Sequence, residues 1–324
     1  MPSLDEPPEV AGEIVAGRAA LDQGDLEEAV MRAARALAVD PASGDARAVL
    51  EAALDRGDDP LKLVAVEDGA SFGVFAVRAF ALARLGRLAE GLELLLQVAA
   101  FRPETPYLEW SLEWVNAHAG VVDRMTDAEL AAIVVRLRAF ARSVRGNVVD
   151  TDPRSRNVDA AIALSRALAS MHPMHDEVTL LACILLRHRG RLDDAIALAE
   201  RSFARTPAWS TAIELAASHR ARGDIEEAAA YYEKGSALDP SDVAALLDLG
   251  DLLLERRRFD RASGAYRRAL EREPGNAWAE ASLLFSEACS NVRPQARDEL
   301  ARLARAGNRR ARELLPALDG GKSS

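Results

Sequence analysis

A proline or asparagine recurs in the second half of this chain at an almost constant interval. The residues are Pro173, Pro207, Pro240, Pro274 and Asn308, which follow one another at 34, 33, 34 and 34 residues. A period in this range is typical of arrays in which each repeat is a pair of helices that buries its apolar face against its neighbours. The chain of 324 residues is therefore predicted to be a stack of helical hairpins rather than a globule around one core.

Within the repeats, a glycine and an alanine stand at fixed distances before the closing proline. The glycine ends the first helix where the backbone must be left-handed, a conformation that costs a residue with a Cβ about 1 to 2 kcal/mol. The alanine allows the paired helices to approach closely, and the proline cannot continue a helix. The glycines that stand seventeen residues before Pro41, Pro103, Pro207 and Pro240 are Gly24, Gly86, Gly190 and Gly223. The alanines that stand twelve residues before Pro41, Pro207, Pro240 and Pro274 are Ala29, Ala195, Ala228 and Ala262.

This pattern resembles the tetratricopeptide repeat, and residues 24–41 and 223–240 match it closely. The resemblance implies an all-α fold, a right-handed solenoid of stacked helix-turn-helix hairpins. Asp25 and Asp224 are expected to cap the second helix of their hairpins. Glu28 and Glu227, three residues further on, would complete a capping box by reaching back to the backbone.

The pattern divides the chain into five regions. They are a flexible acidic N-terminus (1–9), N-terminal repeats (10–105), an irregular helical region (106–175), C-terminal repeats (176–308), and a capping helix with a frayed tail (309–324). The better repeats cover 10–43, 72–105, 176–208, 209–242 and 243–276, and a weaker one covers 277–308. Residues 44–71 are expected to form an abbreviated repeat, in which a short helix is favoured over an extended piece after Gly57.

The middle of the chain departs from the pattern. It has the length of two repeats but shows three helical patterns where four are needed, at 106–118, 127–145 and 157–171, with a polar break at 147–156. An irregular loop on a rigid scaffold is a common place for binding specificity. A degenerate repeat without a special role is the commoner explanation of such a break.

Composition favours a helical protein of the cytoplasm. Hydrophobic residues make up 49% of the chain and aromatic residues only 5%, which suits closely packed, alanine-rich helices. Cys183 and Cys289 fall in separate repeats, so a disulfide is not expected. The first residues lack the pattern of a secretion signal, and no apolar run is long enough to cross a membrane.

No reactive constellation indicates an enzyme. The chain lacks a P-loop, a dinucleotide-binding glycine pattern, a nucleophile elbow and a zinc-protease motif, and no cofactor is expected. His172 and His175, followed by Asp176 and Glu177, form the one cluster with ligand-like spacing. Because Pro173 opens that loop and the acids suit the start of the next helix, a metal site is not expected either.

One basic stretch stands out against a formal net charge of −10. A solvated end cap is the common explanation for such a charge run, and an acidic partner or a nucleic acid is the alternative. The arginines of this basic patch are Arg293, Arg297, Arg302, Arg305, Arg309, Arg310 and Arg312.

The resemblance implies that the first helix of each hairpin lines a concave groove. Such a groove would accept the apolar face of an amphipathic helix, or a peptide whose acids meet Arg84, Arg187 and Arg220. Packing between hairpins is the competing explanation for many of its apolar positions. The predicted groove residues are Ile14, Arg18, Phe80, Arg84, Leu180, Ile184, Arg187, His188, Ile213, Arg220, Leu247, Asp251, Trp278 and Phe285.

The leading hypothesis is a non-enzymatic scaffold or adaptor that binds a peptide or helix of a partner protein in this groove. The alternatives are a regulator associated with nucleic acid through the basic patch, and an accessory subunit of an enzyme complex. Because helical repeat arrays serve many unrelated processes, the fold by itself names no partner.

Overall fold

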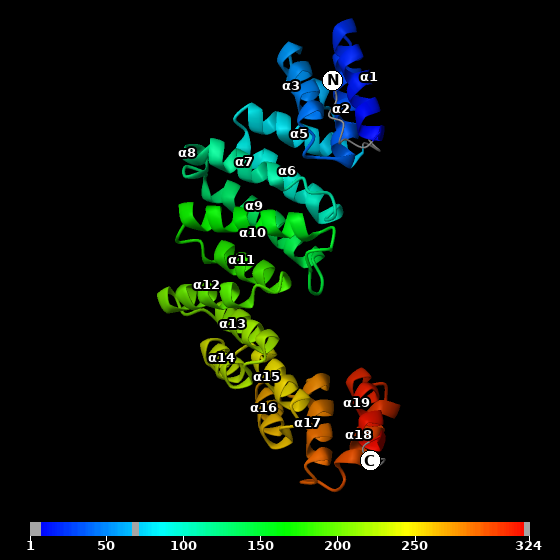
Figure 1. Ribbon diagram of the computed structural model, residues 1–324. Coiled ribbons are helices and arrows are strands. Elements are labelled where there is room, and N and C mark those ends of the chain that lie inside the picture. Colours follow the sequence, from blue (N-terminus) through cyan, green and yellow to red (C-terminus); the bar gives the residue numbers. More distant parts are fainter. Residues whose placement is uncertain (1–7, 67–70, 321–324) are drawn as a thin grey trace. The chain divides into compact units, whose positions relative to one another are not determined.

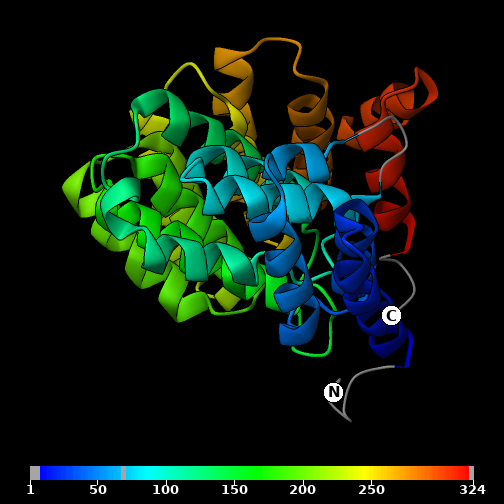
Figure 2. The same ribbon diagram turned by 90° about the horizontal axis from the view of Figure 1, so that it is seen from above.

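A computed structural model describes residues 8–66 and 71–320, and all the regular secondary structure in these ranges is helical (Figures 1 and 2). The predicted all-α fold is therefore confirmed. The predictions that concern residues 1–7, 67–70 and 321–324 lie outside the described ranges.

The chain divides into two compact units, Met1–Arg191 and Leu192–Ser324. The boundary falls between the two helices of the repeat predicted at 176–208. A single array of hairpins that runs through both units stays a prediction.

The first unit begins with three hairpins at the predicted places. Their helices are α1 (Pro8–Gln23), α2 (Leu26–Val39), α3 (Gly44–Arg56), α4 (Pro60–Leu63), α5 (Phe72–Arg84) and α6 (Leu88–Phe101). The short helix favoured for the abbreviated repeat is confirmed by α4, whose first residue, Pro60, has the backbone angle that a helix start requires.

The irregular region follows in the same unit. It contains α7 (Glu109–Ala117), the single-turn α8 (Ala119–Val122), α9 (Asp127–Ser143) and α10 (Ser155–Met171), and the unit's last helix is α11 (Asp176–His188). The three helical patterns of the sequence are confirmed, while α8 is an addition that the sequence did not predict. Residues 147–154 of the predicted polar break lie in the non-helical stretch between α9 and α10, whereas Ser155 and Arg156 already belong to α10.

The second unit continues the hairpins. Its helices are α12 (Leu192–Arg205), α13 (Trp209–Arg222), α14 (Ile225–Leu238), α15 (Ala244–Glu255), α16 (Phe259–Arg272), α17 (Ala277–Cys289), α18 (Ala296–Arg305) and α19 (Arg309–Gly320). One apolar core joins α13 to α17, and a second joins α17, α18 and α19. Helix α19 begins at the residue where the capping helix was predicted to start.

The turn at the register position is left-handed in six hairpins, including two in which glycine is missing. The register glycines Gly24, Gly86, Gly190 and Gly223 have φ values of 80°, 76°, 70° and 95°. Arg257 and Asn291 stand at the same register position, and their φ values are 57° and 59°. The same hydrogen bond closes both kinds of turn: Asp25 N donates to Ala20 O at 2.9 Å, and Arg258 N donates to Leu253 O at 2.8 Å. The array therefore imposes this conformation on residues that disfavour it.

The small residue of the second helix sits where two helices touch. Ala29, Ala195, Ala228 and Ala262 are completely buried. In the hairpin of α5 and α6 the same register position holds Gly91, where a Cβ would lie 2.9 Å from Ala79 O. The pair α5–α6 is thus packed too closely for even an alanine at this position.

The predicted caps are confirmed in one case and wrong in the other. Asp25 accepts a hydrogen bond from Glu28 N at 3.1 Å, while the Glu28 carboxylate accepts one from Arg32 at 2.8 Å. Asp224 makes no cap bond, because its carboxylate contacts His219 Nδ1 at 3.1 Å and also Arg222. The contact with His219, followed by that with Arg222, lowers the pKa of Asp224.

Candidate functional site

The predicted groove residues of the first hairpins belong to the core. Ile14 is completely buried and Phe80 is 5% exposed. The Phe80 ring meets Trp110 edge-on, with 5.7 Å between the centroids, and lies 6.3 Å from Trp114. Both tryptophans project from α7, which therefore covers this part of the first helices. The packing explanation holds for these two predicted residues.

The two predicted arginines of the same hairpins are already paired. Arg18 binds Asp45 at 2.6 Å, and Arg84 binds Asp55 at 2.6 Å and Glu51 at 3.6 Å. All three acids lie on α3, so the neighbouring hairpin supplies the negative charge that a partner was expected to bring.

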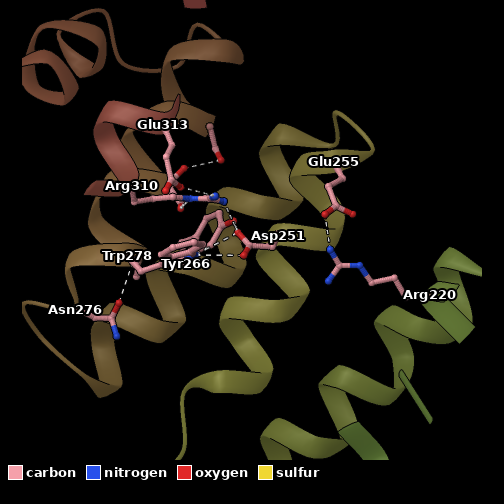
Figure 3. Close-up of polar contacts among 11 residues, drawn as sticks. Arg220, Asp251, Glu255, Tyr266, Asn276, Trp278, Arg310 and Glu313 are labelled. Carbon is pink, nitrogen blue, oxygen red and sulfur yellow. Dashed lines mark hydrogen bonds and ion pairs between the residues drawn. The ribbon is translucent and has the colours of Figure 1, made fainter. Parts of the chain in front are cut away.

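Asp251 is the centre of a polar network in the second unit (Figure 3). It accepts hydrogen bonds from Tyr266 Oη at 2.6 Å, from Arg310 at 2.7 Å and from Trp278 Nε1 at 3.3 Å. The Arg310 guanidinium also lies over the Trp278 ring, 4.0 Å from its centroid. Burial raises the pKa of Tyr266, which therefore stays protonated and donates. Arg310 of α19 thus covers the aromatic face that was predicted to meet a partner.

The other predicted residues of this unit are also engaged within it. Arg220 pairs with Glu255, as Figure 3 shows. Ile213 and Leu247 are partly buried against the core between α13 and α17. Phe285 is 6% exposed and meets Phe259 edge-on at 6.5 Å.

The basic patch is largely a set of internal contacts. Arg293 binds Glu299 at 2.6 Å, and Arg302 lies 3.9 Å from the same glutamate. Arg309 binds Glu313 at 2.9 Å. The guanidiniums of Arg305 and Arg312 donate to the carbonyl oxygens of Ala301 and Ala304 in α18, at 3.2 and 3.0 Å.

His172 and His175, the histidines of the ligand-like cluster, lie within the helical packing of the first unit. His172 Nε2 lies 2.8 Å from Val122 O at the end of α8. His175 Nδ1 is buried and has no hydrogen-bond partner among the described residues. Within residues 8–66 and 71–320, no group of three or more histidines, cysteines and acids gathers as metal ligands.

An open hollow lies between α9 and α11 in the first unit. Its volume is about 480 Å³, and three of the predicted groove residues, Leu180, Ile184 and His188, line it. The full lining comes from the end of α9, the residues that follow it, and α11: Arg138, Ala141, Arg142, Val144, Arg145, Gly146, Glu177, Leu180, Leu181, Ile184 and His188.

The hollow combines an apolar wall with cations. Leu180 and Ile184 are half-buried on α11, so part of each side chain reaches solvent. Arg138 pairs with Glu177, whereas the guanidiniums of Arg142 and Arg145 make no hydrogen bond or ion pair to any other described residue. Both are exposed. This apolar and cationic surface can contact an apolar side chain and a carboxylate at the same time.

The sequence reasoning did not single out these arginines. They stood inside the helix predicted at 127–145, for which no binding site was expected. A signal did exist: Arg138 and Arg142 are four residues apart, so they share one face of α9, and Arg145 follows just after the helix. That α11 would lie opposite this face could not be inferred from spacing.

The loop after α9 is tied to α11 and to Arg189, the residue that follows it. His188 Nδ1 lies 2.8 Å from Gly146 O, and Val148 N donates to His188 O at 2.8 Å. Arg189 donates to Val148 O at 2.6 Å and binds Asp159 at 2.9 Å. These contacts hold the predicted loop 147–156 against α11 at its first residues.

The further course of the loop is held by an Asp–Arg pair. Arg154 donates to Asp152 through its backbone N at 2.9 Å and through its guanidinium at 2.6 Å. The guanidinium bonds, and then the backbone bond, lower the pKa of Asp152 to about 2. The carboxylate is therefore charged at neutral pH and closes this turn.

Sequence models of the tetratricopeptide repeat family match residues 219–284 and 154–208. These two stretches of the chain belong to the tetratricopeptide repeat family. The matched ranges contain the register residues of three repeats and the beginning of the predicted fourth one, and they agree with the helices α10 to α17.

Several solved tetratricopeptide structures are similar to this one. The MamA protein is 18% identical, with a TM-score of 0.41, over 48% of this chain and 86% of that protein. YrrB, described as a TPR protein with an unusual peptide-binding site, is 15% identical, with a TM-score of 0.38, over 52% and 84%. TTC0263 of Thermus thermophilus, described as a thermophilic TPR protein, is 16% identical, with a TM-score of 0.35, over 76% and 99%. The comparison with curated proteins yields no match.

The tetratricopeptide fold supports a role in protein–protein interaction. Among the described residues, none of the helices combines the length and the apolar character that a membrane crossing requires.

Proposed function

We propose that this tetratricopeptide repeat protein is a non-enzymatic cytoplasmic scaffold that binds a segment of a partner protein, as a peptide or an amphipathic helix. The observation that carries the proposal is the hollow between α9 and α11, where predicted groove residues remain open to solvent. Apolar side chains that line an open hollow gain free energy when a partner excludes water from them, about 25 cal/mol for each Å² buried.

The docking surface is centred on Leu180 and Ile184 because they line an open hollow, whereas side chains of the protein pack on Phe80 and on one face of Trp278. Helix α7 covers Phe80, and Arg310 of α19 covers Trp278. A partner at either place would first have to displace packed side chains of the protein itself, whereas the hollow on α11 requires no such displacement.

No observation favours the nucleic-acid alternative. Binding to a phosphate backbone relies on several unpaired cations whose counterions are released. Arg293, Arg302 and Arg309 of the basic patch already face carboxylates in the same unit. An accessory subunit that docks onto an enzyme would use the surface proposed here, so it is included in the proposal as one kind of partner.

The test is a selection of random 16-residue peptides displayed on phage, with the full chain as bait. Binding of the selected peptides is then measured by fluorescence anisotropy. Ile184→Glu places a charge in the hollow and should abolish binding. Val135→Glu is the matched control, because Val135 on α9 is 54% exposed and lies outside the lining of the hollow.

Two results would contradict the proposal. One is a selection that yields no binding peptide, and the other is a set of peptides that bind the Ile184→Glu protein as well as the Val135→Glu protein. Circular dichroism of both variants shows whether the helices remain intact.

A further inference from the structure

Two cations of the α9–α11 hollow, Arg142 and Arg145, lack the acidic partners that several predicted groove arginines have. The formal net charge is −10, and the predicted groove arginines Arg18, Arg84 and Arg220 each bind a carboxylate of a neighbouring helix. At the hollow, one glutamate faces three arginines and is itself paired with Arg138. Arg142 and Arg145 therefore bring uncompensated positive charge to an otherwise acidic protein.

The guanidiniums of Arg142 and Arg145 and the apolar side chains of α11 line the same hollow from different segments of the chain. Arg142 and Arg145 come from the end of α9 and the residues after it, while Leu180 and Ile184 come from α11. An occupant that satisfies both walls must carry apolar side chains along one side and carboxylates along the adjacent side. A helix meets this requirement with apolar residues at i, i+3 and i+4, flanked by aspartate or glutamate.

The hollow is also large enough for such anchors. Its volume of about 480 Å³ lies within the range of about 300 to 1,000 Å³ that is usual for binding pockets. Guanidinium groups bind carboxylates through paired hydrogen bonds, which fix the orientation of the occupant as well as add affinity. Two unpaired cations beside an apolar wall suit an acidic amphipathic segment better than a nucleic acid, which needs a longer basic track.

We infer that the α9–α11 hollow recognises an acidic amphipathic segment of a partner protein, with apolar side chains on Leu180 and Ile184 and carboxylates on Arg142 and Arg145. The inference rests on the proposed function and names the chemistry of the partner at that same surface. The tied loop after α9 holds Gly146 beside His188 and so keeps the cationic wall next to the apolar one.

The experiment examines the peptides selected on the full chain and their dependence on charge. The selected peptides should be enriched in acids next to helically spaced apolar residues. Arg142→Glu/Arg145→Glu should weaken their binding about tenfold or more, since two exposed ion pairs are replaced by repulsion. Raising the salt from about 50 to about 300 mM should weaken binding to the wild-type chain as well, because the charges are exposed.

The matched control is Arg35→Glu/Arg166→Glu. These two arginines are exposed in the same unit, on α2 and α10, and do not line the hollow. The control changes the net charge by the same amount, so it should weaken binding much less if the effect is local. A peptide with lysines in place of its acids should bind Arg142→Glu/Arg145→Glu better than the wild-type chain.

Each outcome has a separate meaning. If the selected peptides are not acidic, or if both double variants weaken binding equally, the inference is wrong, while a loss of binding in Ile184→Glu still supports the proposed function. If no peptide binds, or if Ile184→Glu binds normally, both are wrong. Because Arg142 and Arg145 are exposed, Arg142→Gln/Arg145→Gln offers a second variant that removes the charges without burying new ones.

Discussion

Replacing Arg257 by glycine should stabilise the second unit. Arg257 occupies the register position at which four other hairpins have glycine, and its φ is 57°. A residue with a Cβ pays about 1 to 2 kcal/mol in this region, while the greater freedom of glycine in the unfolded chain offsets about 0.5 to 1 kcal/mol of the gain. The expected net stabilisation is therefore about 0.5 to 1 kcal/mol.

The matched control is Arg256→Gly. Arg256 has the same charge and is also exposed, but its φ of −90° suits any residue. Glycine there brings only its entropic cost, so this variant should lose about 0.5 to 1 kcal/mol. Both variants remove one positive charge, so a difference between them reports the backbone conformation alone.

The assay is native-state hydrogen exchange of the amides of α15 and α16 in the full chain, which localises the change to the hairpin that the turn joins. Urea denaturation of the same proteins gives the direction independently. The reasoning would be refuted if Arg257→Gly were no more stable than the parent chain, or if it lost stability as Arg256→Gly does.

Three further predictions follow from contacts in the two units. Gly91→Ala should lower the free energy of unfolding by about 1 to 3 kcal/mol, since its Cβ would lie 2.9 Å from a backbone oxygen. The control Gly12→Ala, whose Cβ would have no atom within 4 Å, should raise it by up to about 1 kcal/mol, and equal shifts of the two thermal melts would contradict this. Arg310→Gln should shift tryptophan emission to longer wavelength and cost about 1 to 2 kcal/mol, because Asp251 and Trp278 lose their cation; an unchanged spectrum would argue against that contact. Asp152 has a pKa lowered from 3.8 to about 2, so its stabilisation of the loop is present above pH 3.8 and lost as the pH falls towards 2. The protection of the amides of residues 147–156 from hydrogen exchange, relative to the intrinsic rate at each pH, should fall over that range in the parent chain but stay low and constant in Asp152→Asn.

The hairpins could be predicted from the sequence because their signals are local. A glycine, an alanine and a proline at fixed register positions mark the turn, the contact and the end of a hairpin, and each acts within one or two helical turns. The same reasoning failed at Asp224, because its cap position is in reach of His219 and Arg222, and a side chain can serve only the partners that the fold brings nearest. It also failed to predict α8, a single turn with no distinct pattern of its own.

The candidate site was predicted only in part. Leu180, Ile184 and His188 were placed on the inner face of their hairpin by register alone, and they line the hollow. The family register also selected Ile14 and Phe80, which are buried, because it assumes a regular groove and cannot include a covering element such as α7, which packs on Phe80. The register therefore predicts the direction in which a side chain points from its helix, while its exposure to solvent depends on the segment that packs opposite it.

By itself, the sequence determined that this chain forms helical hairpins and where most of them begin and turn. These properties depend on residues that lie close together along the chain. Only the tertiary structure decided that Arg310 would cover Trp278, that acids of α3 would pair with Arg18 and Arg84, and that Arg142 and Arg145 would remain unpaired beside Leu180. Such pairings join residues tens of positions apart, and their free energy depends on distances and water exclusion that no periodic pattern specifies.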